Sequence, residues 1–174
     1  MSGIDYNLSL IRAFVFDVDG VLSPSTIPVN DAGEPQRMAN IKDGYAIQLA
    51  CKLGYPIAII TGAKSESIKH RYNSLGVKDV FLGSETKIDI LTQWAEKMRL
   101  QPEEILYMGD DIPDYEPMNY VGLSCCPIDA SHDILSHALY VSPQQGGYGC
   151  VRDVMEQVLR SQGQWMHDER AFGW

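Results

Sequence analysis

Short apolar runs alternate with longer amphipathic stretches along most of this chain. The apolar runs predict strands at residues 13–16, 57–60, 80–82, 105–108, 121–124 and 139–141. The stretches between and after them predict helices at residues 44–53, 65–75, 87–98, 115–119, 130–137 and 150–161. Repeated strand–helix–strand units are typical of a parallel sheet with helices on both faces. The sequence therefore predicts an α/β fold with a doubly wound parallel sheet, in a single domain that spans residues 1–174.

One segment early in the chain interrupts this rhythm. Residues 23–41 contain three prolines and the turn sequence Asn30-Asp31-Ala32-Gly33, with apolar residues on either side. Two short extended arms around such a turn predict a β-hairpin, and a mobile surface loop is the alternative. Because the segment directly follows the first strand, we expect the hairpin to protrude from the carboxyl edge of the sheet.

The C-terminal segment, residues 162–174, is also unusual. It contains Trp165, Phe172 and Trp174 among charged residues. Large aromatic side chains are costly to leave in water, so the sequence favours docking of this segment on its own chain or on another subunit. A disordered terminus is the alternative.

Composition narrows the classes of function. Fourteen basic and 23 acidic residues give a net charge of −9, which argues against electrostatic capture of nucleic acid or of an anionic membrane. An anionic substrate would need cations placed locally. The four cysteines form neither a disulfide framework nor a zinc pattern, and no apolar run approaches the roughly 20 residues that span a bilayer. We therefore expect a cytoplasmic protein with reduced thiols.

Residues 14–22 carry the strongest chemical signal. An apolar strand ends in Asp17 and Asp19, separated by one residue and followed by Gly20. Alternation along the strand directs both carboxylates to the same side, and ligands bind at this edge of α/β sheets. Carboxylates a few ångströms apart repel one another unless a cation or a shared proton lies between them. The motif therefore predicts a metal site.

Polar residues follow two further strands, and Lys87 begins the helix after another. Thr61-Gly62 follows residues 57–60, and Gly109-Asp110-Asp111, with Asp114 close behind, follows residues 105–108. In a parallel sheet these residues converge at one edge, and their chemistry suits phosphoryl transfer. Asp17 and Asp110 offer oxygen ligands to Mg²⁺, while Thr61 and Lys87 can neutralise phosphate oxygens. In this scheme Asp17 attacks phosphorus, and Asp19 protonates the leaving alcohol before it activates water.

Together these residues resemble, in order, the motifs of the haloacid dehalogenase-like phosphatases. The resemblance extends from residue 13 to about residue 142 and implies a Rossmann-like core. It implies that Asp17 is the nucleophile and Asp19 the acid/base, and that Thr61, Gly62 and Lys87 bind phosphate. The metal ligands would be the carboxylates of Asp17 and Asp110 and the backbone oxygen of Asp19. Asp111 and Asp114 would support the site.

The spacing of the motifs leaves no room for a cap domain. The chain thus resembles the small capless sugar-acid phosphatases, a likeness strengthened by Asn40–Gly44, by Arg71 and by the Gly146–Arg152 segment. This resemblance implies that Asp43 and Arg71 bind substrate, and that the protein is a homotetramer in which a neighbouring subunit covers the site. It implies hydrolysis of an eight-carbon 3-deoxy sugar-acid phosphate, octulosonate 8-phosphate, for lipopolysaccharide precursor synthesis.

Three alternatives stay open. The residue after Thr61-Gly62 is Ala63, where many of the similar octulosonate-phosphate enzymes have arginine and a relative that acts on nonulosonate 9-phosphate has glutamate. A nine-carbon, sialic-acid-like substrate is therefore the first alternative, although the hairpin and the Gly146–Arg152 segment favour the eight-carbon acid. The second is a broad phosphatase of small metabolites. The third is a non-catalytic oligomeric scaffold on the same fold.

Overall fold

Six parallel strands form a single sheet at the centre of the molecule. The computed structural model describes residues 3–173. The strands are β1 (Ala13–Phe16), β2 (Ile57–Ile60), β3 (Asp79–Phe81), β4 (Ile105–Met108), β5 (Leu123–Pro127) and β6 (Tyr140–Ser142). Their spatial order is β3-β2-β1-β4-β5-β6, and every neighbouring pair is parallel. The predicted α/β fold is confirmed.

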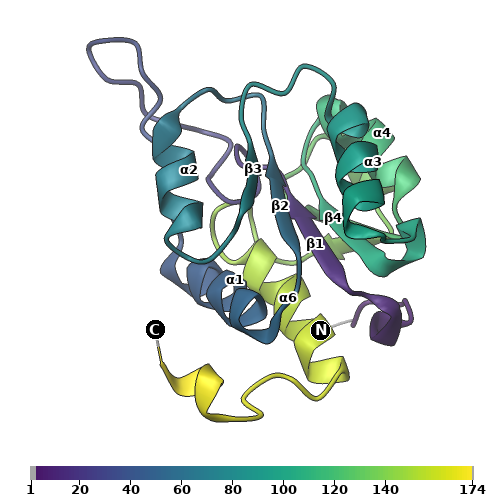
Figure 1. Ribbon diagram of the computed structural model, residues 1–174. Helices are drawn as coiled ribbons and strands as arrows, with labels where there is room; N and C mark the ends of the chain where they lie inside the picture. The colour runs from purple at the N-terminus through teal and green to yellow at the C-terminus, as the bar shows by residue number, and fades with distance from the viewer. Residues whose placement is uncertain (1–2, 174) are drawn as a thin grey trace.

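Helices cover both faces of the sheet (Figure 1). They are α1 (Ile41–Leu53), α2 (Glu66–Asn73), α3 (Lys87–Met98), α4 (Tyr115–Tyr120), α5 (His132–His137) and α6 (Cys150–Ser161). Short 3₁₀ turns are η1 (Leu8–Leu10), η2 (Pro102–Glu104), η3 (Ile112–Asp114) and η4 (Glu169–Phe172). Among residues 3–173, none of the helices combines the length and the apolar character that crossing a membrane requires.

Side-chain alternation in the central strands divides the core into two layers. Phe14 and Phe16 point into the layer beneath α1, α2 and α6, whereas Ala13 and Val15 point into the layer beneath α3, α4 and α5. All four residues are fully buried. A strand that is apolar on both sides has to lie in the middle of a two-faced sheet. The position of β1 between β2 and β4 follows from this pattern.

The predicted element boundaries agree with the structure except at a few ends. Helix α1 begins at Ile41, three residues before the predicted start, because the Asn40 side chain accepts hydrogen bonds from the backbone N–H groups of Lys42 and Asp43. Strand β5 runs through Cys125 and Cys126, both buried, and so lies further along the chain than predicted. Helix and strand ends that are set by caps or by sheet register are the hardest to predict from the hydrophobic periodicity of the sequence.

The hairpin within residues 23–41 protrudes from the body of the protein, next to the first turn of α2 (Figure 1). Val29 and Pro35 form an antiparallel bridge, and the Asn30 side chain accepts hydrogen bonds from the N–H groups of Ala32 and Glu34 across the turn. The β-hairpin prediction is confirmed. The hairpin is small, and no cap domain is evident in the described chain.

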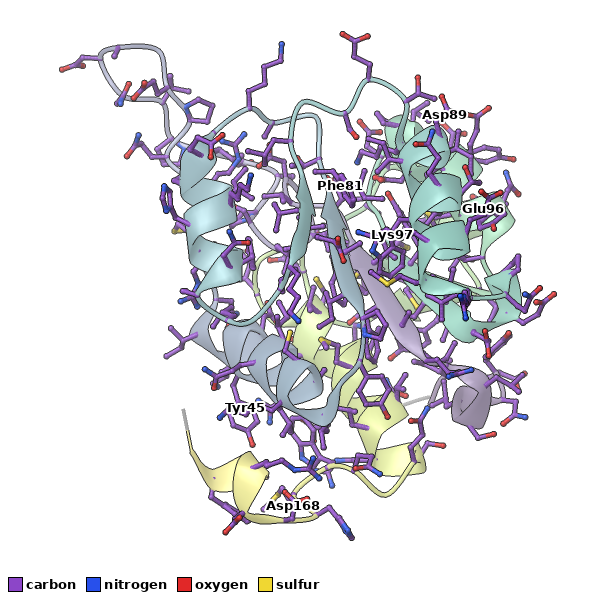
Figure 2. The ribbon with its side chains drawn as sticks, viewed as in Figure 1. Tyr45, Phe81, Asp89, Glu96, Lys97 and Asp168 are labelled. Carbon is purple, nitrogen blue, oxygen red and sulfur yellow. The ribbon has the colours of Figure 1, made fainter. Side chains whose placement is uncertain are left out.

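The C-terminal segment folds back onto α1 and α6 of its own chain. Trp165 is buried, and Arg152 lies over its ring at 4.3 Å from the centroid. Tyr45 of α1 meets Trp165 edge-on and donates a hydrogen bond to the carbonyl of Ala171 (Figure 2). The segment therefore docks at the end of the molecule opposite the hairpin, while Trp174 lies outside the described residues.

Candidate active site

The carboxyl end of β1 is where the chain order of the sheet reverses. The chain passes from β1 to β2 on one side and reaches β4 on the other. Ligands bind at this switch point in open α/β sheets because the loops on either side diverge and leave a crevice. Asp17 occupies it, since it directly follows β1 and donates its backbone N–H to the carbonyl of Met108 in β4. The motif in residues 14–22 predicted a metal site at this edge of the sheet.

Three carboxylates and one ammonium meet there. Oxygen atoms of Asp17, Asp110 and Asp114 lie within 4.8 Å of one another. Lys87 Nζ lies 2.9 Å from Asp17 Oδ2 and 2.7 Å from Asp114 Oδ1, and only 6% of its side chain is exposed. The cluster therefore has one buried cation and three acids. When the acids are ionised its net charge is negative, so it can bind a further cation.

Asp114 is held in this cluster by hydrogen bonds to both of its carboxylate oxygens. Its Oδ1 accepts hydrogen bonds from Lys87 Nζ and, at 2.6 Å, from the Tyr107 hydroxyl. Its Oδ2 accepts from the backbone N–H groups of Asp110 and Asp111, at 3.1 Å and 3.4 Å. Both oxygens are thus engaged by the protein. The carboxylates left for a metal ion are those of Asp17 and Asp110, the pair predicted from the sequence, whereas Asp111 contributes its backbone.

Gly20 is what allows Asp110 to reach this position. The residue has φ of +87°, and a Cβ atom there would lie 1.9 Å from Asp110 Oδ2. A left-handed backbone without a side chain is therefore needed where the loop after β1 passes the loop after β4. Glycine next to the paired acids of the motif is thus part of the site's geometry.

Burial and repulsion from neighbouring acids disfavour the charged forms of Asp17 and Asp110. Burial is the largest cause that raises the pKa of Asp17 to about 7, and the charge of Asp114 adds to it. Burial likewise raises the pKa of Asp110 to about 8, followed by the charge of Asp17. A divalent cation relieves both effects because it stabilises the deprotonated carboxylates. The donor set of hard oxygens fits Mg²⁺.

Thr61 and Gly62 lie at the same edge, after β2. Thr61 is buried, its Oγ1 accepts a hydrogen bond from the N–H of Ala63 at 3.1 Å, and its carbonyl accepts from the N–H of Ser84. Gly62 is exposed. The tight turn holds a hydroxyl next to the strand end that carries Asp17, and phosphate binding by Thr61 and Gly62 stays a prediction.

Asp19 is paired with an arginine that sequence reasoning missed. Arg37, in the returning arm of the hairpin, donates from Nε to Asp19 Oδ1 at 2.6 Å and from Nη2 to Asp19 Oδ2 at 2.7 Å. Eighteen positions separate the two residues, so no local spacing signals the pair. Tyr107 was missed as well, although strand alternation directs it to the α3 face, where Asp114 lies.

Asp43, predicted to bind substrate, caps another helix. Its Oδ1 accepts a hydrogen bond at 2.7 Å from the backbone N–H of Arg152, in the first turn of α6. The N-cap position of α6 is Gly149, which has no side chain to do this. Asp43 Oδ2 is buried without a hydrogen-bond partner among the described residues. The structure thus gives Asp43 a structural contact, and its role toward substrate stays a prediction.

Replacing Asp43 by asparagine should stabilise the protein at neutral and alkaline pH. Burial is the main cause that raises the pKa of Asp43 from 3.8 to about 6. A folded pKa above the unfolded value means that protonation favours folding, and this contribution is lost as the pH rises through 6. Asparagine keeps the cap without the buried charge, so we expect the free energy of unfolding to rise by about 1–3 kcal/mol at pH 8. The gain should shrink towards pH 4 in urea titrations. A less stable variant at pH 8 would refute this account of Asp43.

Arg71 lies beside α1 and lines a small cavity. A Cβ atom at Gly44 would lie 2.6 Å from Arg71 Nη2, so the glycine permits this close approach. The cavity has a volume of about 170 Å³ and is also lined by Ser23 and Arg37. Arg71 Nε and Ser23 Oγ are buried there without hydrogen-bond partners among the described residues. Buried polar groups are normally paired, so these two atoms favour a polar ligand in the cavity.

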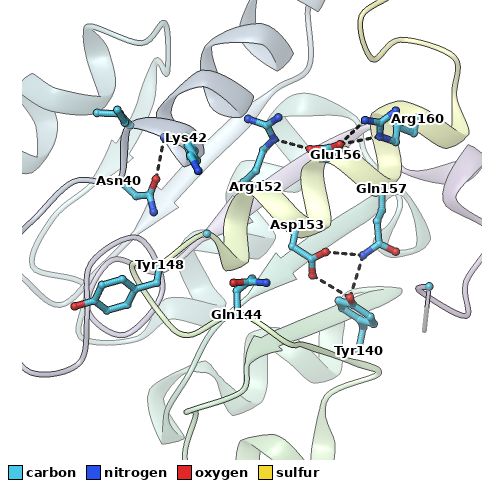
Figure 3. A pocket seen from close by; sticks show the side chains of 13 residues that line it. Asn40, Lys42, Tyr140, Gln144, Tyr148, Arg152, Asp153, Glu156, Gln157 and Arg160 are labelled. Carbon is cyan, nitrogen blue, oxygen red and sulfur yellow. Dashed lines mark hydrogen bonds and ion pairs between the residues drawn. The ribbon is translucent and has the colours of Figure 1, made fainter. Parts of the chain in front are cut away.

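Two larger hollows lie nearby. A cleft of about 670 Å³ between the hairpin and the start of α2 is lined by Arg37, Ala63 and Lys64, among others. A groove of about 660 Å³ lies between the start of α1 and α6 (Figure 3). Tyr148, Arg152 and the interlinked Asp153, Gln157 and Tyr140 line this groove, which contains none of the predicted catalytic residues. The cleft is linked to the predicted catalytic residues by Arg37, which binds Asp19, and by Ala63, which donates to Thr61 Oγ1.

This chain is similar in sequence to known proteins. Residues 79–152 match the family profile of the haloacid dehalogenase-like hydrolases. The chain is 37% identical over 153 residues to 3-deoxy-D-manno-octulosonate 8-phosphate phosphatase of Escherichia coli K12, covering 88% of this chain and 81% of that protein. The enzyme of that name from Yersinia pestis is 36% identical over 152 residues, covering 87% and 81%.

Solved structures agree. The Yersinia pestis phosphatase superposes with a TM-score of 0.87 at 34% identity, covering 91% of this chain and 85% of that one. The Moraxella catarrhalis phosphatase, solved with a magnesium ion, a phosphate ion and a KDO molecule, gives a TM-score of 0.86 at 28% identity, covering 91% of each chain. Fold and site thus define a Rossmann-like hydrolase, and the chain belongs to the haloacid dehalogenase-like phosphatase family. Within it, the chain is similar to the 3-deoxy-D-manno-octulosonate 8-phosphate phosphatases.

Proposed function

We propose that this protein is a Mg²⁺-dependent phosphatase that hydrolyses 3-deoxy-D-manno-octulosonate 8-phosphate to the free sugar acid and phosphate. The free acid would serve lipopolysaccharide precursor synthesis. The observation that carries the proposal is the cluster of Asp17, Asp110 and Lys87 at the end of β1. It occurs in a chain 37% identical to phosphatases of that name.

The chain's own residues account for two chemical steps. An Asp17 oxygen attacks phosphorus and forms an aspartyl phosphate, while the bond from phosphorus to the sugar oxygen breaks. Asp19 gives its proton to that leaving oxygen, takes a proton from water in the second step, and so returns to its first state. Water attacks the aspartyl phosphate and releases phosphate. Thr61, Gly62 and Lys87 hold the phosphate oxygens throughout.

Mg²⁺ would be held by the carboxylates of Asp17 and Asp110 and the backbone oxygen of Asp19. When bound, it supplies positive charge that offsets repulsion between the Asp17 carboxylate and an anionic phosphate. Asp114 and Asp111 would orient this set from outside, since the Asp114 carboxylate is already engaged by Lys87, Tyr107 and two backbone N–H groups. Lys87 balances part of the remaining negative charge.

The cleft lined by Arg37, Ala63 and Lys64 is the proposed seat of the sugar acid, with Arg71 as a further cation. In a chain of net charge −9, Lys64 and Arg71 supply the local positive charge that an anionic substrate needs, because Asp19 offsets the charge of Arg37. The small side chain of Ala63 leaves room in this cleft. The eight-carbon acid is preferred because it is named for the relatives.

A substrate comparison tests the proposal. Purified protein with Mg²⁺ should release phosphate from octulosonate 8-phosphate with a kcat/KM at least about tenfold higher than from nonulosonate 9-phosphate or simple hexose phosphates. Equal or reversed values would overturn the assignment of substrate. Absence of turnover on every sugar phosphate would instead favour the scaffold alternative.

We further propose that the protein is a homotetramer in the cytoplasm, in which a second copy covers the open site. Met38, next to Arg37, is 50% exposed, and Ile41 and Tyr148, which line the groove between α1 and α6, are 69% and 57% exposed. Exposed apolar side chains of this size favour burial between subunits. The four free cysteines fit a reducing compartment. Light scattering should give four chain masses, whereas a stable monomer would leave the site without this cover.

A further inference from the structure

We propose that Arg37 is a positioning residue for Asp19, and that the hairpin is therefore a working part of the active site. The inference rests on the proposed function, in which Asp19 carries the proton in both steps. It concerns a residue on an element that otherwise projects away from the catalytic edge. Its basis is the pairing of one guanidinium with both oxygens of one carboxylate.

The pair has the geometry of a strong, directional contact. Nε and Nη2 of Arg37 lie 2.6 Å and 2.7 Å from the two oxygens of Asp19, so the planar fork faces the carboxylate with two parallel hydrogen bonds. The Arg37 side chain is only 13% exposed, compared with 36% for Asp19. The arginine is thus largely enclosed, while the carboxylate stays partly accessible.

Asp19 needs such a partner because little else constrains it. Asp17 pairs with the buried Lys87. Asp19 lies in the loop after β1, and its ion pair with Arg37 is the one described for it. A half-exposed aspartate has several accessible rotamers, and a proton carrier has to stay within hydrogen-bond reach of the leaving oxygen and of the attacking water. The pair sets the direction of the carboxylate before substrate arrives, and one of its two hydrogen bonds opens when Asp19 takes up the proton that it gives to the leaving oxygen.

The hairpin is built to hold Arg37 in place. The Asn30 side chain bridges the turn through the N–H groups of Ala32 and Glu34. Next to Arg37, Gln36 donates its backbone N–H to the carbonyl of Pro28 at 2.8 Å on the opposite arm. The two arms are therefore tied together one residue from Arg37. Anchoring on a paired arm limits how far the guanidinium can move from Asp19.

Arg37→Met tests this role, because it should affect kcat and KM to different extents. On octulosonate 8-phosphate, kcat should fall roughly 10- to 100-fold, a part of the contribution that general acid–base catalysis makes, while KM should change by less than about threefold. Arg37→Lys should recover only part of the loss, because an ammonium cannot bind both oxygens in a fork. Arg12→Met removes an arginine paired with Glu104 at the other end of β1 and should leave kcat unchanged.

A double-mutant cycle separates this inference from the proposed function. If Arg37 acts through Asp19, adding Arg37→Met to Asp19→Asn should slow turnover no further. With p-nitrophenyl phosphate, whose leaving group needs no proton, the first burst of p-nitrophenolate from Arg37→Met should stay within about threefold of wild type. A loss confined to KM, or an undiminished effect in the Asp19→Asn background, would overturn the positioning role. Full activity of Asp19→Asn itself would instead refute the proposed mechanism.

Discussion

Asp17→Asn is expected to reduce phosphatase turnover by about 10⁴-fold or more while the protein stays folded. The amide has the shape of the carboxylate but cannot form the aspartyl phosphate. The loss should fall on kcat, because removing one negative charge from a cluster of three acids does not weaken attraction for a phosphate. Burial already raises the pKa of Asp17 to about 7, so a neutral side chain at this position costs the fold little.

The measurement is phosphate release under single-turnover conditions, together with circular dichroism and binding of inorganic phosphate by calorimetry. Asp79→Asn is the matched control, because Asp79 begins β3 and pairs with the mostly exposed Lys97. It should keep wild-type activity. Residual turnover of Asp17→Asn within a hundredfold of wild type would remove Asp17 as the nucleophile.

Much of the fold was readable because each strand near the centre is apolar on both faces. The predicted bounds of β1, β2 and β4 match those observed, since a short apolar run between polar segments leaves little choice. The peripheral strands were predicted less accurately. In β5 the buried run continues through Cys125 and Cys126 to Pro127, and pairing with β6 sets its end. That partner is the next strand along the chain, beyond α5, so the apolar run of β5 alone does not show where the pairing ends.

The residues of the site also differ in how well the sequence predicts them. Asp17, Lys87 and Asp110 follow strands or begin a helix, so the sheet topology alone brings them to one edge. Arg37 could not be assigned because its partner depends on how a hairpin of irregular backbone returns to the sheet. The cap that Asp43 provides for α6 depends on packing between α1 and α6, far apart in sequence. Sequence patterns identify residues fixed by topology better than those fixed by loop geometry and helix packing.

The second large effect is expected from Lys87→Met, in both stability and activity. Lys87 is the buried cation that faces Asp17 and Asp114, at 2.9 Å and 2.7 Å. Removing one partner of a buried ion pair leaves uncompensated charge, which typically costs about 3–5 kcal/mol in the free energy of unfolding. Turnover should fall about 10³-fold as well, because a cation that stabilises the phosphate oxygens is lost.

The change in melting temperature on adding Mg²⁺ is the most specific test of this prediction. Without Lys87 the three acids repel one another more strongly, so a divalent cation at Asp17 and Asp110 offsets a larger cost and should raise the melting temperature of Lys87→Met more than that of wild type. Lys97→Met is the control on the same helix, since Lys97 is 67% exposed and pairs with Asp79 at 3.3 Å. It should change stability by less than about 0.5 kcal/mol and respond to Mg²⁺ as wild type does. If Lys87→Met and Lys97→Met gained equally from Mg²⁺, the acids near Lys87 would not be the metal site. The ammonium of Lys87 and the metal ion thus act on the same excess of negative charge, and the fold supplies only one of these two cations itself.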